Sequence, residues 1–466
     1  MIGELDYPEH DQEGNERFES RESSKRSVDR GWPPKDESFT MAMHAVRERE
    51  EAFESGGASM TKNVMTDFGA VGDNVHDDAS DIQKALDTGD DVYLPTPPAR
   101  YKVGSALRTI RPGQKVFGDH RLRSMLSVAT AFPGSGVITA HPQDPGPVLQ
   151  DFGISFLQPD TNVRSSLTVY PPAIFGRNSP RILIDRVYIE RATVGVDLGL
   201  HSGQSTIRFF ECSAFDKHVF IDEAFDTMRL DHVHLGPWGA TASQLQILND
   251  PSTHGVVAGR VDDLKIHDSL IGVGTGMHAF RSRDGAVSAE IVGTGFEIGG
   301  IDMDGGFLVI SGGYFAIGPG RGHAIKQTGG DVTLAGVRMN VTGVNAEPMV
   351  AVSGGASFVW AGGTVFLNAQ DRCLVRSEDP GTTINLSGIT VFRDPDVAYS
   401  QPTFWKAGGM ATIIGTVAGN DFAGGSCTVI RIDGESHDCV MGNALCGGKI
   451  IVPSSPELGV YGPNSR

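Results

Sequence analysis

The stretch DFGAVGDNVHDDASDIQKALDTGDDVYLP, residues 67–95, places a loop rich in glycine and aspartate before a short amphipathic pattern and a strand-like run. The aspartates of DDASD can cap a helix, and Gly89 can end it. Ile82, Ala85 and Leu86 would share one face of that helix. DDVYLP follows as a strand. The stretch therefore predicts a short helix that covers the exposed end of a larger core.

The same loop does not match a ligand-binding motif. The spacing of Asp73, Asp77 and Asp78 differs from that of an EF-hand, and GAVGD lacks the Lys-Ser/Thr pair of a P-loop. We expect no metal ion and no cofactor, and we interpret the loop as structural.

A short pattern recurs after residue 148: an apolar residue, any residue, an apolar residue, any residue and a turn residue. It occurs as ILIDR at 182, IRFFE at 207, MRLDH at 228, LKIHD at 264, AEIVG at 289, LVISG at 308, VTLAG at 332, FVWAG at 358, INLSG at 384 and ATIIG at 411. A second apolar strand often follows, as in VGVDLG and HVFIDE. Two or three short strands in roughly 25 residues bury a core only when such units stack, which predicts a parallel β-helix.

The fifth position of the later copies is always glycine. These residues are Gly293, Gly312, Gly336, Gly362, Gly388 and Gly415. Such a column predicts a turn that repeats one strained backbone geometry on every rung. The high glycine content, 60 of 466 residues, agrees with a chain of many tight turns.

Composition excludes several classes of protein. The net charge is -18 and no basic cluster stands out, which argues against a nucleic-acid partner. No run of about 18 apolar residues exists, so no membrane-spanning helix is expected. Five scattered cysteines without a C-x-x-C pair indicate reduced thiols. The first residues lack the apolar core of a signal peptide, so we expect that the protein, if it acts outside the cell, is released by a route other than a signal peptide.

The sequence predicts four regions. Residues 1–60 hold 15 acidic and 8 basic residues and one expected helix, and they form a possible attachment segment. The others are the capping helix with the first coils (61–147), the body of the β-helix (148–425) and an end segment (426–466).

Residues 67–95 closely resemble the opening signature of the pectate-lyase-like superfamily of right-handed β-helix proteins. The next stretch, RYKVGSALRTIRPGQKVFGD, continues the resemblance more loosely, because TPPAR replaces the glycine expected before the tyrosine. This superfamily includes phage tailspike depolymerases, exopolygalacturonases and polysaccharide lyases. The signature carries no catalytic residue. A charged N-terminal segment before a β-helix looks most like a tailspike. The resemblance therefore implies a homotrimer that degrades a bacterial surface polysaccharide and is bound through its N-terminus to other tail proteins.

The repeat predicts which residues lie in one outward column. Its second position reads Leu183, Arg208, Arg229, Lys265, Glu290, Val309, Thr333, Val359 and Asn385. Neighbouring rungs lie about 4.8 Å apart, so three successive cations would repel each other without a negative group across them. An anionic sugar chain would supply that group, and pairing with neighbouring acids is the alternative. Arg208, Arg229 and Lys265 are therefore predicted to bind substrate.

Polar residues gather in the fourth and fifth positions of the early copies. Asp185, Glu211, Asp231, His232 and Asp268 lie there, followed by His234 and Trp238. The longest interval between copies, 36 residues, comes next and predicts an extra loop. This coincidence predicts a groove between about residues 185 and 268, with Trp238 and Asp268 as binding residues.

Two chemistries fit these residues. Glycoside hydrolysis needs two carboxylates, and Glu211 with Asp231 is the favoured pair, Asp185 with Asp231 the second. A lyase would instead use His232, His234 or Tyr188 as the base, and the cations would neutralise a uronate carboxylate. A saccharide-binding or structural tail protein without catalysis is a third possibility.

Overall fold

The computed structural model describes residues 60–461 with gaps at 273–277, 284, 286, 298, 319–321, 343–346, 369–372, 394–400, 420–426, 434–437, 442, 447 and 452–459. The described residues belong to one of two units into which the chain divides, Ser59–Arg466. The expected helix and attachment segment of residues 1–60 fall outside the described residues, apart from Met60. No helix of the described part is long and apolar enough to cross a membrane.

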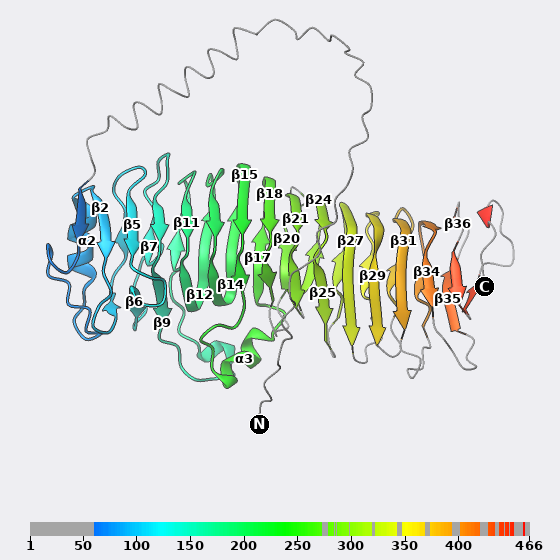
Figure 1. Ribbon diagram of the computed structural model, residues 1–466, viewed down its shortest axis with the longest axis horizontal. Coiled ribbons are helices and arrows are strands. Elements are labelled where there is room, and N and C mark those ends of the chain that lie inside the picture. The colour runs from blue at the N-terminus through cyan, green and yellow to red at the C-terminus, as the bar shows by residue number, and fades with distance from the viewer. Residues whose placement is uncertain are drawn as a thin grey trace, which may run out of the picture. The chain divides into compact units, whose positions relative to one another are not determined.

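The described chain is an all-parallel, right-handed β-helix in which three sheets wind around one core. The strands follow one another along a single axis (Figure 1). Sheet 1 contains β1 (Thr61–Asn63), β2 (Asp91–Leu94), β5 (Lys115–Gly118), β8 (Val148–Gln150), β11 (Leu183–Asp185), β13 (Thr206–Arg208), β15 (Ala224–Asp231), β18 (Val261–His267), β21 (Val287–Val292), β24 (Phe307–Ser311), β33 (Met410–Ile414), β36 (Cys439–Met441), β39 (Val460–Tyr461) and the first parts of β27 (Asp331–Thr342), β29 (Ser357–Asn368) and β31 (Thr383–Arg393).

Sheets 2 and 3 complete each turn. Sheet 2 contains β3 (Tyr101–Lys102), β6 (Met125–Val128), β9 (Gly153–Phe156), β16 (His234–Leu235), β19 (Leu270–Ile271), β22 (Gly295–Glu297), β25 (Tyr314–Ile317), β34 (Val417–Gly419), β37 (Ala444–Cys446), the first parts of β12 (Tyr188–Gly199) and β14 (Glu211–Asp222), and the second parts of β27, β29 and β31. Sheet 3 contains the second parts of β12 and β14 with β4 (Leu107–Arg108), β7 (Ile138–Thr139), β10 (Ile174–Phe175), β17 (His254–Ala258), β20 (His278–Ser282), β23 (Gly300–Met303), β26 (Ile325–Gln327), β28 (Val350–Val352), β30 (Val375–Ser377), β32 (Phe404–Lys406), β35 (Cys427–Ile432) and β38 (Gly448–Ile451).

Helix α2 (Ala79–Asp87) lies against the first rungs, as residues 67–95 predicted. Its buried residues include Ile82, Ala85 and Leu86, and Gly89 follows it with φ +75°. Asp78 occupies the N-cap position, within the aspartates predicted to cap the helix, but its side chain does not bond to the helix: its carboxylate accepts hydrogen bonds from the N–H groups of Val71 (2.6 Å) and Gly72 (3.1 Å). The loop before the helix has its own N–H groups to satisfy, and this buried carboxylate satisfies two of them.

An insertion interrupts the regular coils after β16, where the sequence predicted an extra loop. It carries α3 (Ala242–Leu248), which Thr241 and Gln244 start with a capping box. Ile247 and Leu248 pack on Phe215 in a small cluster of their own. The single 3-10 turn of the described chain, η1 (Arg164–Ser166), lies nearby, and Arg164 donates to the carbonyls of Phe215 and Ile247. The insertion therefore leaves the chain between sheets 2 and 3.

One backbone geometry repeats at the corner between sheets 1 and 2. The predicted glycine column has φ between 60° and 67° at all six positions. The corner residues from Asp151 to Gly312 also donate their N–H to the last strand residue of the next rung, as Gly293 does to Ser311 (3.0 Å) and Gly312 to Ala335 (2.8 Å). We call this set of positions the corner ladder. In the earlier rungs its members are not glycine: Asp151, Arg186, Phe209, His232 and Asp268 have φ of 59°, 53°, 49°, 51° and 46°.

We predict that replacing a glycine of the ladder costs stability through the backbone alone. Gly336 has φ +63°, and a Cβ built on it would meet nothing within 4 Å. Gly336→Ala should therefore lower the free energy of unfolding by about 1 kcal/mol, because a left-handed conformation strains an L-residue. Gly336→Asn should cost less, because asparagine tolerates this conformation. Denaturant unfolding of the three proteins measures both, and an equal loss for Asn and Ala would contradict the explanation.

Candidate functional site

Two cavities flank the corner ladder in the middle of the solenoid. The first, which we call the corner cavity, has a volume of about 690 Å³. It is lined by Arg121, Phe209, Glu211, His232, Val233, His234, Asp268, Ser269, Leu270, Gly293, Gly295 and Tyr314. The second, the sheet-1 groove, has a volume of about 520 Å³ and is lined by Leu183, Thr206, Arg208, Arg229, Leu230, Asp231, Lys265 and His267. They meet at the corner, because residues 231–232 and 267–268 pass from the groove into the cavity.

The structure brings eight of the ten predicted site residues to these cavities. Glu211, His232, His234 and Asp268 line the corner cavity, and Arg208, Arg229, Asp231 and Lys265 line the groove. Asp185 and Trp238 line neither. Sequence reasoning missed Arg121, Phe209 and Tyr314 as lining residues.

The prediction that three successive cations share one column was wrong for Arg208. Ile207 pairs with Ile184 and Leu230, so Thr206 rather than Arg208 lies next to Arg229 in that column. Arg208 belongs to the next outward column, between Asp185 and Asp231. For the same reason Phe209 occupies the corner, where Glu211 was expected, and Glu211 begins sheet 2.

The three cations differ in their partners. Arg208 donates to Asp185 (3.2 Å), and Lys265 lies 3.7 Å from Glu290. Arg229 is exposed and has no ion pair within the described residues. Pairing with neighbouring acids thus accounts for Arg208 and Lys265, and Arg229 is left as a cation available to a ligand.

Asp185 is buried and bonded to two arginines, which indicates a structural role. It is 2% exposed, and its Oδ2 accepts hydrogen bonds from Arg186 (2.8 Å) and Arg208 (3.2 Å). Tyr188, a candidate base, donates to Glu190 (3.0 Å), and burial raises the pKa of its hydroxyl. Neither group reaches the cavities.

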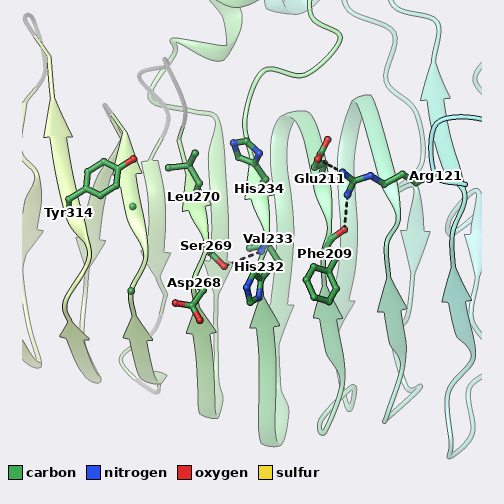
Figure 2. A pocket seen from close by; sticks show the side chains of 12 residues that line it. Arg121, Phe209, Glu211, His232, Val233, His234, Asp268, Ser269, Leu270 and Tyr314 are labelled. Carbon is green, nitrogen blue, oxygen red and sulfur yellow. Dashed lines mark hydrogen bonds and ion pairs between the residues drawn. The ribbon is translucent and has the colours of Figure 1, made fainter. Parts of the chain in front are cut away.

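Glu211 is held from a distant part of the chain. Arg121, in the turn between β5 and β6, lies 2.6 Å from its Oε1 and donates to the carbonyl of Phe209 (3.0 Å) (Figure 2). Both side chains of the ion pair are about a quarter exposed, at 28% and 25%. The pair closes one end of the corner cavity and holds the Glu211 side chain in place.

His234 lies one rung from Glu211 in sheet 2. Partial burial lowers the pKa of its imidazole below the ordinary 6.5, and Glu211 acts in the opposite direction. Its Nε2 has no hydrogen-bond partner in the described part of the chain. Trp238 contacts the ring edge-on at 4.3 Å between centroids and donates to the His234 carbonyl (3.3 Å). Trp238 therefore positions a neutral imidazole, although it does not line the cavity.

Asp231, His232 and Asp268 form a compact group at the corner. One ligand-type atom from each lies within 4.8 Å of the others, and Oδ1 of Asp231 is 3.0 Å from Nδ1 of His232. By geometry this group and one at His76, Asp78 and Asp81 could hold a metal ion. Its chemistry also suits proton transfer, since two carboxyl groups face the junction of both cavities.

Tyr314 closes the other end of the corner cavity. Its hydroxyl donates to Glu297 (2.8 Å), and burial, together with that carboxylate, raises the pKa of Tyr314 to about 12. A Cβ on Gly295 would lie 2.6 Å from this ring, so only glycine leaves room for it.

We predict that the pKa of His234 responds in opposite directions to its two charged neighbours. Glu211→Gln removes a negative charge that favours the imidazolium, so the pKa should fall further below 6.5. Arg121→Met removes a positive charge and should raise it. NMR titration of the His234 ring measures both shifts, with His76, which lies outside both cavities, as an internal control. Shifts of the same sign would contradict this electrostatic description.

Neither a protein family nor a curated protein matches the sequence. Among solved structures, the tailspike protein gp49 from Pseudomonas phage LKA1 aligns with a TM-score of 0.54 at 13% identity, covering 80% of this chain and 77% of that one. The tailspike gp42 of Acinetobacter phage vb_AbaP_AS12 (TM-score 0.47, 12% identity, 70% and 62% covered) and the A-module of the mannuronan C-5 epimerase AlgE6 of Azotobacter vinelandii (0.44, 17%, 84% and 100%) also align. The likeness to gp49 shows the fold: the right-handed β-helix that residues 67–95 predicted is confirmed.

Proposed function

We propose that this chain is a tailspike-like enzyme that binds a bacterial surface polysaccharide and cleaves it by glycosidic hydrolysis. The observation that carries the proposal is the approach of Asp231 and Asp268 to within 4.8 Å at the junction of the two cavities. Polysaccharide chains need an elongated, open surface, and the groove and cavity together extend over successive rungs. The fold shared with a phage tailspike supports this class of substrate.

The two carboxyl groups have distinct places in the proposed reaction. Retaining glycosidases hold their carboxyl groups about 5–5.5 Å apart and inverting enzymes about 6.5–9.5 Å apart. Carboxylate oxygens of Asp231 and Asp268 lie within 4.8 Å of each other, which is nearer to the retaining range, and we therefore propose retention. One would protonate the leaving oxygen and the other would attack the anomeric carbon. Glu211, held by Arg121, would accept hydrogen bonds from sugar hydroxyls. Glu211 with Asp231 is the second candidate pair.

An acidic polymer fits the groove best. Arg229 is exposed without an ion pair in the described chain, and Lys265 and Arg208 lie in the same groove. A carboxylate on the sugar would bind Arg229 and offset its repulsion with Lys265 on the next rung. We include in the proposal a homotrimer bound to other tail proteins through the N-terminal segment, on the strength of the tailspike resemblance.

Replacing either carboxylate of the pair should stop the reaction while the fold persists. Asp231→Asn and Asp268→Asn should each lower kcat by at least about 100-fold, because each removes a group that transfers a proton or attacks the sugar. Asp262→Asn, an exposed aspartate on β18 that lines neither cavity, is the matched control. Circular dichroism and thermal unfolding would verify the fold. Full activity of Asp268→Asn with loss in Glu211→Ala would move the reacting pair to Glu211 and Asp231.

Elimination is a second candidate reaction, favoured by the state of His234. A neutral imidazole with a free Nε2 can remove the proton beside a uronate carboxylate, and Arg121 lies in the same cavity to neutralise that carboxylate. The rate would then increase as the pH rises through the lowered pKa of His234.

A single assay separates these reactions. The protein is incubated with acidic and neutral bacterial capsule and exopolysaccharides, and reducing ends and the ultraviolet absorbance of unsaturated uronates are followed together. We expect reducing ends without absorbance. Both signals would assign elimination, with His234→Gln as the inactive variant. Neither signal, in a panel that includes the host polymer, would overturn the enzyme and favour a saccharide-binding tail protein.

A further inference from the structure

Phe209 occupies a backbone position that does not suit it. It has φ +49° and is 43% exposed at the rim of the corner cavity. Bulky residues rarely adopt such a conformation, because it strains the backbone of a folded protein. An exposed phenylalanine in a strained position gains little from burial that would offset this strain.

The fold itself does not need a side chain at the corner. Six later rungs make the same turn with glycine, and four of these, Gly312, Gly336, Gly362 and Gly415, would have nothing within 4 Å of an added Cβ. The corner N–H donates across the rungs in both cases, from Phe209 to Asp231 (3.0 Å) as from Gly312 to Ala335 (2.8 Å). Glycine would therefore serve the turn at position 209 as well.

The other strained members of the ladder have partners or tolerate the geometry. Arg186 binds the carboxylate of Asp151 through two nitrogens, at 2.6 and 2.9 Å. His232 lies against Asp231, and histidine and aspartate are among the residues that adopt this conformation most often. Among the described residues, the one ring contact of Phe209 is with His232, with centroids 5.0 Å apart and planes at 32°. The contacts within the folded chain therefore do not explain why position 209 is a phenylalanine.

We infer that Phe209 and His232 form a stacking platform for one sugar ring next to Asp231 and Asp268, and that Phe209 thereby helps to determine which sugar binds. The inference rests on the proposed function and names a subsite within it. A sugar presents polarised C–H groups on one face, which the negative face of an aromatic ring attracts. Phe209 and His232 occupy neighbouring rungs, about 4.8 Å apart, so their two rings can span one pyranose.

The surroundings hold this platform in place. Asp231 fixes the His232 ring through Nδ1, and Arg121 holds the Phe209 carbonyl. A Cβ on Gly293 would lie 2.6 Å from Oδ1 of Asp268, so the ladder returns to glycine where that carboxylate needs space. Figure 2 shows Phe209, His232 and Asp268 in one row along the corner, below Glu211 and His234. A sugar ring bound on the platform would direct its substituents toward Glu211 and His234.

The experiment compares Phe209→Ala, Phe209→Gly and Phe209→Trp in the full chain. The readouts are KM and kcat on the panel polysaccharide that the wild type cleaves, or Kd on one that it only binds. Ala and Gly should raise KM or Kd by about 2- to 10-fold with kcat within about threefold, because each variant removes the stacking contact of one aromatic ring. Trp should retain wild-type values. Phe307→Ala, which removes a 61% exposed phenylalanine outside both cavities, should change neither constant.

Thermal unfolding tests the strain separately from the sugar. Both small variants lack the ring, but only Gly relieves the backbone, so Phe209→Gly should unfold at a higher temperature than Phe209→Ala, by about 1–3 °C. The inference is overturned if KM and Kd do not change in Ala and Gly, if kcat alone falls, or if Gly unfolds below Ala. Unchanged constants with an active wild type would reject the platform and leave the enzyme standing. A wild type that neither cleaves nor binds any polymer would reject the proposed function, and the platform with it.

Discussion

The left-handed turn between sheets 1 and 2 is the constraint on which the rest of the described structure depends. Each turn of the chain must leave sheet 1 and enter sheet 2 without losing the hydrogen bond to the next rung. A residue with φ near +60° does this, since its N–H then points along the axis at the neighbouring carbonyl. The corner ladder thereby fixes the stacking register of two sheets and the positions of all side chains near it.

The corner ladder has two parts, one in which every corner residue is glycine and one in which the corner residues carry side chains. In the later rungs glycine makes the turn without strain, and the outward column beside it holds Val309 and Val359. In the middle rungs the turn carries Phe209, His232 and Asp268, and the adjacent column carries Arg229 and Lys265. Three of the five non-glycine members of the ladder, Phe209, His232 and Asp268, line the corner cavity, where a bound ligand would offset their strain under the proposed function.

Much of this architecture could be predicted from the sequence because it repeats. The glycine column, the apolar pairs and the amphipathic helix at residues 79–87 are local patterns, and each was found in the expected place. The register of IRFFE could not be fixed in this way. A strand alternates with a period of two, so Ile207 matches either buried position of the pattern equally well, and only its neighbours on adjacent rungs decide. Arg121 could not be predicted as a site residue for another reason. It contacts Glu211, which lies 90 residues further along the chain, and it belongs to no repeated sequence pattern.

The cross-rung hydrogen bond of the corner ladder has a further consequence for how such a protein can change over generations. Because the turn is satisfied by backbone atoms, the side chain at each rung can be exchanged without disturbing its neighbours, at a small and local cost. A lineage could therefore lengthen, shorten or re-specify the outer surface of the solenoid by one step of about 4.8 Å at a time. The glycine rungs from 293 onward form a reserve of corner positions without side chains, to which a new binding surface could be added.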